Sequence, residues 1–206
     1  MDEKNGVEKK SKNNKSQLST VKIISLIIFA FSICLSCNTV RRDYERLMGS
    51  QVIFPETLQR VEKQDTLPFV TNNDNAHMVI YYDSTQCNTC AVSKLGDWDS
   101  IIDDAKSIYE DIDFVFIMSP TKSDQKKVIR DIVINYSDYN VAFDDCGAFS
   151  QSNPQIPQDN RFHTMLLDKN NNVVLIGNPL YSNSIWELMK EALMNIKNNN
   201  GQFVAN

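Results

Sequence analysis

Residues 78–95 read MVIYYDSTQCNTCAVSKL, and this stretch decides how the rest of the chain is interpreted. Its first five residues are apolar, β-branched or aromatic, which is typical of a buried strand. A polar turn follows at 83–86, and then two cysteines spaced C-x-x-C, Cys87 and Cys90. Apolar residues then recur with a helical period, which predicts a helix that reaches about residue 105. The order is therefore strand, turn, cysteine pair and helix.

A C-x-x-C pair in this context indicates redox chemistry. Unpaired backbone N–H groups at the start of a helix favour a thiolate. We therefore expect Cys87 to be the more exposed nucleophile, and Cys90, one turn deeper, to resolve a mixed disulfide by attacking Cys87. A static disulfide and half of a zinc site are the alternatives. Zinc is disfavoured because the sequence has no histidine pair, and its other thiols are Cys34 and Cys37 in the predicted signal region and the single Cys146.

The first 36 residues predict a secretory signal. Residues 1–22 carry six lysines, and residues 23–36 form an uncharged apolar run that is short for a membrane span. A basic segment, a short apolar segment and a small residue before a cleavage point are the parts of such a signal. Residues 35–37, LSC, resemble a bacterial lipobox, although the usual leucine three positions before the cysteine is Cys34 here. This resemblance implies cleavage before Cys37 and acylation of that cysteine, whereas the alternative is an uncleaved signal anchor.

The chain without that signal is acidic, with 15 basic and 23 acidic side chains and a net charge of −8. This balance suits solubility and argues against a nucleic-acid partner or a polybasic membrane-binding surface. The length predicts one globular domain plus appendages. We expect a lipoprotein signal peptide at 1–36, a tether and N-terminal extension at 37–75, the domain at 76–197 and a frayed tail at 198–206.

Three strands and two helices are predicted for the first part of the domain. Strands are expected at 78–82, 112–118 and 139–143, and a helix over about 123–136 separates the last two. Strands that alternate with helices imply right-handed crossovers and parallel pairing.

A β-hairpin and a helix are predicted for the second part of the domain. Apolar runs at 162–167 and 173–176 flank the polar turn 168–172, which favours a hairpin. An amphipathic pattern over about 184–197 predicts the last helix. In the N-terminal extension, residues 52–55 fit a short edge strand, and residues 56–70 have no assignment.

This order of elements, βαβαβ followed by a hairpin and a helix, resembles the thioredoxin fold. More closely, the chain is similar to the membrane-attached, extracytoplasmic thiol–disulfide proteins of the TlpA type, which are related to thioredoxin and the peroxiredoxins. That family carries an extra strand and helix, represented here by residues 139–152, and a hairpin motif similar to residues 165–174, MLLDKNNNVV. The resemblance covers about residues 76–197. It implies an α/β fold with a central mixed sheet flanked by helices.

Three departures from the family's pattern concern the site. Gln86 stands where the family usually has Trp before the first cysteine, and Thr89 stands where it has Pro before the second. The family also places a cis-proline just before the hairpin, against the disulfide. That position falls near Phe162, and Pro157 lies too early to supply it. The family's usual way of docking substrates is therefore in question for this chain.

His163 and Cys146 complete the set of candidate residues. The resemblance places His163 near the cysteine pair, and two thiolates with an imidazole suit copper, so Cys87, Cys90 and His163 are an alternative metal set. A half-buried strand histidine is the simpler interpretation. Cys146 should lie two strand spacings from the central strand, about 10 Å, which is too far for a disulfide with Cys87. We therefore expect Cys146 to be a free thiol, and a buried, inert one.

The sequence thus predicts a membrane-anchored, extracytoplasmic thiol–disulfide oxidoreductase that uses Cys87 and Cys90 as its catalytic pair and needs no cofactor. Its expected partners are extracytoplasmic protein thiols or disulfides, a redox partner, and the membrane through acylated Cys37, but no nucleic acid. The expected location is the cell envelope, facing the periplasm or the exterior. Two other classes remain open, a copper-binding chaperone of the same fold and a non-catalytic binding lipoprotein whose cysteine pair is a structural staple.

Overall fold

The computed structural model describes residues 39–62 and 65–205. The predicted signal segment and the predicted lipidation site Cys37 lie outside these residues. The chain divides into two units, Met1–Arg42 and Asp43–Asn206. Of the first unit only residues 39–42 are described, and they are helical. Within the described ranges, no helix is both long and apolar enough to cross a membrane.

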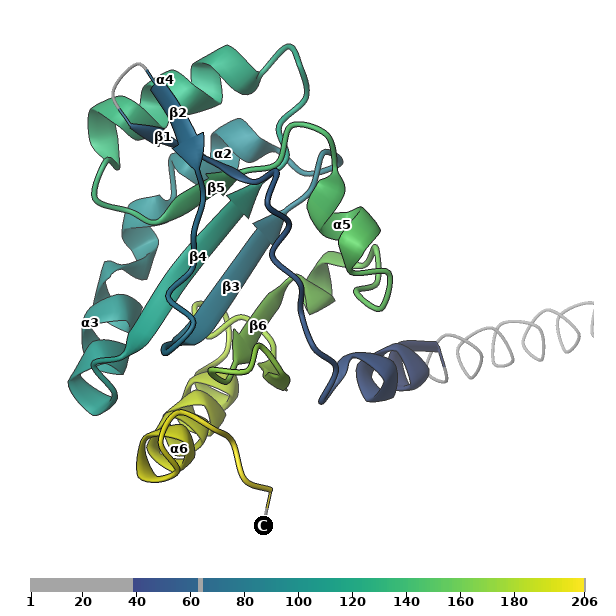
Figure 1. Ribbon diagram of the computed structural model, residues 1–206, viewed down its shortest axis with the longest axis vertical. Coiled ribbons are helices and arrows are strands. Elements are labelled where there is room, and N and C mark those ends of the chain that lie inside the picture. The colour runs from purple at the N-terminus through teal and green to yellow at the C-terminus, as the bar shows by residue number, and fades with distance from the viewer. Residues whose placement is uncertain (1–38, 63–64, 206) are drawn as a thin grey trace, which may run out of the picture. The chain divides into compact units, whose positions relative to one another are not determined.

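The Asp43–Asn206 unit is built on a mixed sheet of seven strands in the order β2-β1-β5-β4-β3-β6-β7 (Figure 1). The strands are β1 (Gln59–Glu62), β2 (Asp65–Pro68), β3 (Ala76–Tyr82), β4 (Ile112–Met118), β5 (Val141–Phe143), β6 (Thr164–Leu167) and β7 (Val173–Ile176). The three central strands β3, β4 and β5 are parallel, and all other pairs are antiparallel. Together with the helices, this arrangement confirms the predicted α/β, thioredoxin-like fold.

The helices on one face of the sheet enclose the main core. They are α2 (Asn88–Val92), the 3₁₀ turn η1 (Leu95–Trp98), α3 (Asp99–Ile108), α4 (Gln125–Asn135) and α6 (Asn183–Asn198). Side chains alternate between the two faces of a strand. Met78 and Ile80 of β3, and Phe114 and Phe116 of β4, therefore point to the same side and pack against these helices. Trp98 is almost fully buried there, as expected for a packing residue.

The opposite face is covered by the N-terminal extension and by α5 (Ala148–Ser152). Leu47, Val52 and Leu58 are buried, and Phe54 lies 5.5 Å from the ring of His77 on β3. The backbone of this segment also bonds to the β6–β7 hairpin, since Gly49 N donates to Val173 O at 2.8 Å. From Asp43 onward, the extension is therefore a layer of the fold and not only a tether.

Two expectations about the elements were wrong. Residues 52–55 do not form the expected edge strand, and β1 and β2 extend the sheet instead. The helix after the cysteines is broken at residues 93–98, where Ser93 Oγ bonds back to Cys90 O and Gly96 weakens the helix. In the tail, Gly201 O accepts a hydrogen bond from Lys169 N of the hairpin turn at 2.9 Å.

The hairpin turn behaves as predicted. Asp168 is buried, and its Oδ1 accepts hydrogen bonds from the backbone of Asn170 and Asn172, both at 3.0 Å. Asn171 between them has a left-handed backbone with φ of 61°, which asparagine tolerates better than most residues.

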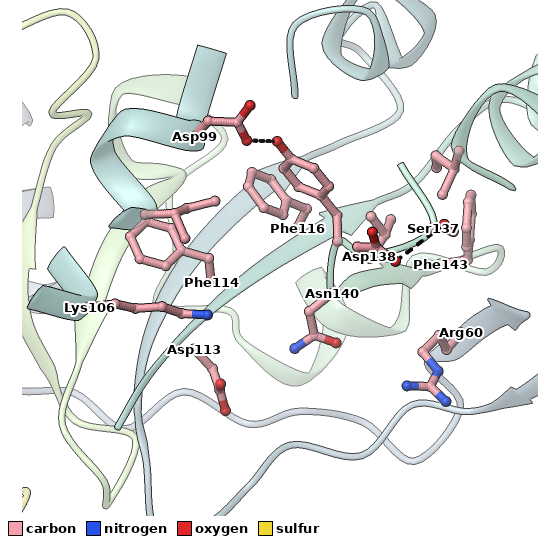
Figure 2. A pocket seen from close by; sticks show the side chains of 14 residues that line it. Arg60, Asp99, Lys106, Asp113, Phe114, Phe116, Ser137, Asp138, Asn140 and Phe143 are labelled. Carbon is pink, nitrogen blue, oxygen red and sulfur yellow. Dashed lines mark hydrogen bonds between the residues drawn. The ribbon is translucent and has the colours of Figure 1, made fainter. Parts of the chain in front are cut away.

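A cavity of about 490 Å³ lies beside α3 and over β4 and β5 (Figure 2). Phe114 and Phe116 form its floor, and the Tyr139 hydroxyl donates a hydrogen bond to Asp99 at its rim. Burial, and then the bond to Asp99, raise the pKa of Tyr139. No cysteine or histidine lines this cavity, so we do not place the redox chemistry here.

Candidate active site

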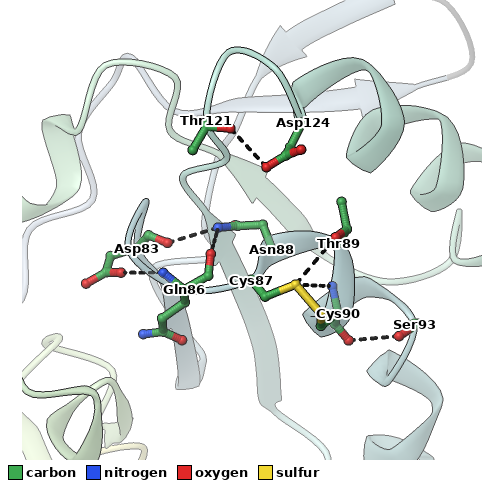
Figure 3. The surroundings of a disulfide bond; sticks show 9 residues. All are labelled: Asp83, Gln86, Cys87, Asn88, Thr89, Cys90, Ser93, Thr121 and Asp124. Carbon is green, nitrogen blue, oxygen red and sulfur yellow. Dashed lines mark hydrogen bonds between the residues drawn. A yellow bond between two sulfur atoms is a disulfide. The ribbon is translucent and has the colours of Figure 1, made fainter.

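Cys87 and Cys90 are joined in a disulfide at the start of α2 (Figure 3). Their Cα atoms lie 5.2 Å apart, within the usual range for such bonds. Cys87 is the N-cap residue of α2, and its Sγ accepts a hydrogen bond from the backbone N–H of Cys90 at 3.3 Å. That N–H would also stabilise a Cys87 thiolate in the reduced protein.

The two cysteines differ less in exposure than the sequence suggested. Cys87 is exposed as expected, but Cys90 is exposed as well and does not lie deeper. The reason is local, since α2 is only five residues long and both sulfurs face the same small cavity. What distinguishes the pair is hydrogen bonding, because Cys87 Sγ receives the N–H bond and lies 3.5 Å from Thr89 Oγ1.

A network of side chains fixes the turn that carries the cysteines. Asp83 Oδ1 accepts hydrogen bonds from the backbone N–H groups of Thr85 and Gln86, at 2.9 and 3.2 Å. Asn88 is buried, and its Nδ2 donates to Asp83 O and Gln86 O at 2.9 and 3.2 Å (Figure 3). Asn88 was not predicted as a site residue. The only sequence signal for this network was Asp83 two residues before Thr85, because aspartate side chains often accept backbone hydrogen bonds within turns.

His163 joins the site through a contact that the sequence did not reveal. It is buried just before β6, where η2 (Asn160–Phe162) ends. Its Nδ1 lies 3.0 Å from Gln86 Nε2, and its Nε2 lies 2.9 Å from the carbonyl oxygen of Pro157. Tyr81 N donates to His163 O at 2.8 Å, which ties this loop to β3. The histidine is therefore more buried than expected and is linked directly to the residue before Cys87.

The region where the resemblance would place a cis-proline has another structure. Phe162 is buried, His163 follows it with φ −87° and ψ 0°, and no cis peptide bond occurs in the described residues. The loop is instead held by the His163 hydrogen bonds to Gln86 and Pro157.

Two cavities that share lining residues lie at and next to the disulfide, and we call them together the active-site groove. The smaller, of about 170 Å³, is lined by both cysteines and by Leu180, and the larger, of about 470 Å³, by Thr164 and His163. They share Tyr82, Gln86 and Tyr181. Tyr181 is 78% exposed, so an aromatic ring stands free at the edge of the groove.

Cys146 lies in a separate cavity of about 530 Å³ at the same edge of the sheet. β4 lies between β3 and β5 as expected, and Cys146 is a free thiol. The expectation of a buried cysteine was wrong, because Cys146 is exposed in the loop after β5. Buried Asp144 holds that loop by accepting hydrogen bonds from Ala148 N and Phe149 N at 2.8 and 3.0 Å.

The alternative copper set is not assembled by this arrangement. Both ring nitrogens of His163 are engaged by Gln86 and Pro157. Across the described part of the chain, no group of three or more histidine, cysteine, aspartate or glutamate side chains is placed to hold a metal ion.

No family model matches the chain, and no curated protein matches it. Solved structures of similar fold include a thiol:disulfide interchange protein DsbE, described as putative, from Chlorobium tepidum, at 14% identity over 71% of this chain and 97% of that one, with a TM-score of 0.49. The thioredoxin domain of a thiol-disulfide oxidoreductase from Bacteroides vulgatus is 14% identical over 69% and 97%, with a TM-score of 0.43. A peroxiredoxin-like protein from Aquifex aeolicus is 14% identical over 70% and 86%, with a TM-score of 0.44. Because these TM-scores are all below 0.5, the fold assignment stands on the strand order and connections given above.

Proposed function

We propose that this protein is a thiol–disulfide oxidoreductase whose catalytic pair is Cys87 and Cys90. The observation that carries the proposal is the exposed disulfide at the N-terminus of α2, with a backbone N–H directed at Cys87 Sγ and a groove beside it. A buried structural disulfide would offer neither access for a second thiol nor space for its chain.

The chemistry is an exchange of two electrons. The thiolate of reduced Cys87 attacks one sulfur of a substrate disulfide, which forms a mixed disulfide and releases one substrate thiolate. The thiolate of Cys90 then attacks Cys87 Sγ, which releases the second substrate thiolate and leaves the Cys87–Cys90 disulfide. The same steps in reverse oxidise a substrate dithiol. A separate redox partner returns the pair to its starting state.

Single serine variants of the full chain test this assignment. Cys87→Ser should abolish exchange with a disulfide-bonded protein, because the attacking thiol is gone. Cys90→Ser should accumulate a mixed disulfide between Cys87 and the substrate, visible by non-reducing electrophoresis and mass spectrometry. Cys146→Ser is the matched control and should keep the exchange rate of the wild type. If neither thiol of the pair reacts faster than free cysteine, the assignment is wrong.

The staple alternative is weaker on energetic grounds. The disulfide joins residues only three apart in sequence. Closing so short a loop removes little entropy from the unfolded chain and stabilises the fold by about 2 kcal/mol in the chain-entropy model. A disulfide stabilises a fold more when it closes a long loop, so this pair is poorly placed for a structural role.

We also propose that the protein works outside the cytoplasm, anchored to the membrane by acyl chains on Cys37. The support is the basic segment, the apolar run at 23–36 and the lipobox-like residues 35–37 in the sequence. Disulfides persist in the oxidising compartments of the cell envelope, which suits this chemistry. Its substrates there would be protein thiols or disulfides, and mass spectrometry of Cys37 tests the anchor.

A further inference from the structure

The hydrogen bonds of His163 define where its proton lies. Its Nε2 is 2.9 Å from the carbonyl oxygen of Pro157, and a carbonyl oxygen can only accept, so Nε2 carries a hydrogen. In neutral imidazole the other nitrogen, Nδ1, is then an acceptor. Gln86 Nε2, 3.0 Å away, must be the donor to it.

This arrangement leaves the other end of the Gln86 amide for the groove. No described residue donates a hydrogen bond to Gln86 Oε1, while its Nε2 is used by His163. Gln86 lines both parts of the active-site groove and directly precedes Cys87. With neutral His163, the groove beside the nucleophile therefore offers a hydrogen-bond acceptor.

A proton on His163 reverses the polarity of that position. Both ring nitrogens then carry hydrogens, and the bond from Nε2 to Pro157 O is kept. Nδ1–H would face the Gln86 NH₂ group, donor against donor, unless the amide turns over and presents Oε1 to the ring. The turn keeps the number of hydrogen bonds and moves the NH₂ group into the groove, which then offers a donor.

We propose that His163 is a positioning residue that acts through Gln86. Its protonation state determines whether the groove presents a hydrogen-bond acceptor or a donor to the substrate backbone next to the reacting cysteine. The substrate role rests on the function proposed above, whereas the coupling of the two side chains does not. An acceptor pairs with a peptide N–H, and a donor with a peptide C=O. Histidine is the side chain whose protonation changes most readily near neutral pH, so the tests below vary the pH.

The ionisable groups around His163 are mostly acidic. The titratable and charged groups that face it or share a cavity with it come from β3 and the turn after it, from the loop after β5, from its own loop and from the loop after β7. They are Tyr81, Tyr82, Asp83, Asp144, Asp145, Cys146, Asp159, Arg161 and Tyr181. Carboxylates outnumber cations in this set, and Arg161 is already paired with Asp159 at 2.5 Å.

Nuclear magnetic resonance of the oxidised full chain tests the coupling without any substrate. The side-chain amide signals of Gln86 should shift between pH 5 and 8 with the same midpoint as the ring of His163. In His163→Gln, the Gln86 signals should no longer titrate. If the Gln86 signals of the wild type stay constant while His163 titrates, the switch is wrong.

Kinetics of the reduced full chain test the consequence for substrates. We compare the rate constants for two substrates, a disulfide-bonded peptide and a small aromatic disulfide without a peptide backbone. Both depend equally on the thiolate fraction of Cys87, so that fraction cancels in their ratio. This ratio should change between pH 5 and 8 by about two- to tenfold, the range of one hydrogen bond. In Gln86→Met the ratio should be constant, whereas exposed Gln158→Met, the matched control, should follow the wild type.

The outcomes separate this inference from the function on which it rests. A ratio that still changes with pH in Gln86→Met would overturn the role of Gln86 in substrate binding. Absence of exchange with both disulfides would end the proposed function, and the resonance experiment would then decide alone whether His163 and Gln86 are coupled.

Discussion

His77 is a buried histidine whose ring nitrogens make no hydrogen bond of normal geometry. It lies on β3 under the N-terminal extension, against the ring of Phe54. Burial lowers the pKa of His77 below its ordinary value of 6.5, and the nearby carboxylate of Asp113 opposes that shift only in part. The folded protein therefore binds this proton less readily than the unfolded chain does.

This difference predicts a loss of stability in acid. Because the folded-state pKa is lowered, the contribution of His77 is complete above about pH 6.5 and declines as the pH falls through that value, by at most about 1.4 kcal/mol per pH unit. His77→Phe, which keeps a ring and removes the titration, should gain stability over the wild type at pH 5 relative to pH 8. Urea unfolding of both proteins at the two pH values measures this, and an equal difference at both would contradict it.

The residues of the site were only partly accessible from the sequence. Cys87 and Cys90 follow from their spacing and from the strand and helix around them. Gln86 and His163 are 77 positions apart, and their contact depends on how the loop before β6 folds back against β3. The exposure of Cys90 was also mispredicted, because the break after α2 depends on side-chain bonding at Ser93 that helical periodicity does not encode.

At the scale of elements, Asn153 joins the N-terminal extension to α5. It is fully buried, and its side chain accepts from Ile53 N and donates to Ile53 O, both at 2.8 Å. It also donates to Phe149 O at 2.8 Å. One amide thus satisfies the backbone of two segments that are 100 residues apart in sequence.

Removing this amide should loosen the layer that covers the sheet. Asn153→Ala removes the partners of the part-buried N–H and C=O groups of Ile53, whereas Phe149 O keeps the hydrogen bond from Asn153 N, so we expect a loss of about 1–3 kcal/mol of unfolding free energy. Asn160→Ala is the control, because Asn160 is exposed and its side chain makes no hydrogen bond within the described residues. Chemical denaturation compares the two variants, and similar unfolding free energies would show that the Asn153 hydrogen bonds do not stabilise the fold.

The elements that could not be predicted from the sequence have one physical explanation. Residues 43–47 end a short helix, residues 48–58 have little regular secondary structure, and both pack on the sheet through scattered apolar side chains such as Leu47, Val52 and Leu58. Such a segment shows neither a helical nor a strand period, so periodicity cannot identify it. The central strands and α6 were found because their apolar residues follow those periods.

For the whole molecule, the sequence determined the order of strands and helices, and right-handed crossovers then placed β3, β4 and β5 side by side. That order brings the Cys87–Cys90 pair, the loop of His163 and the loop of Cys146 to one edge of the sheet. Loops at the carboxyl ends of parallel strands are a frequent place for binding sites in α/β folds. The position of the site was therefore predictable where its detailed contacts were not.

The anchoring of the whole protein is the last prediction. If the signal is processed before Cys37, the mature chain begins at that cysteine and carries acyl chains on it. One acyl chain gives only marginal and reversible membrane binding, whereas two or more hold a protein stably. Native protein should therefore stay with membranes until detergent is added, and Cys37→Ser should release it or leave residues 1–36 uncleaved. Mass spectrometry of the N-terminal peptide distinguishes these states, and an unmodified Cys37 in the wild type would rule out the lipid anchor.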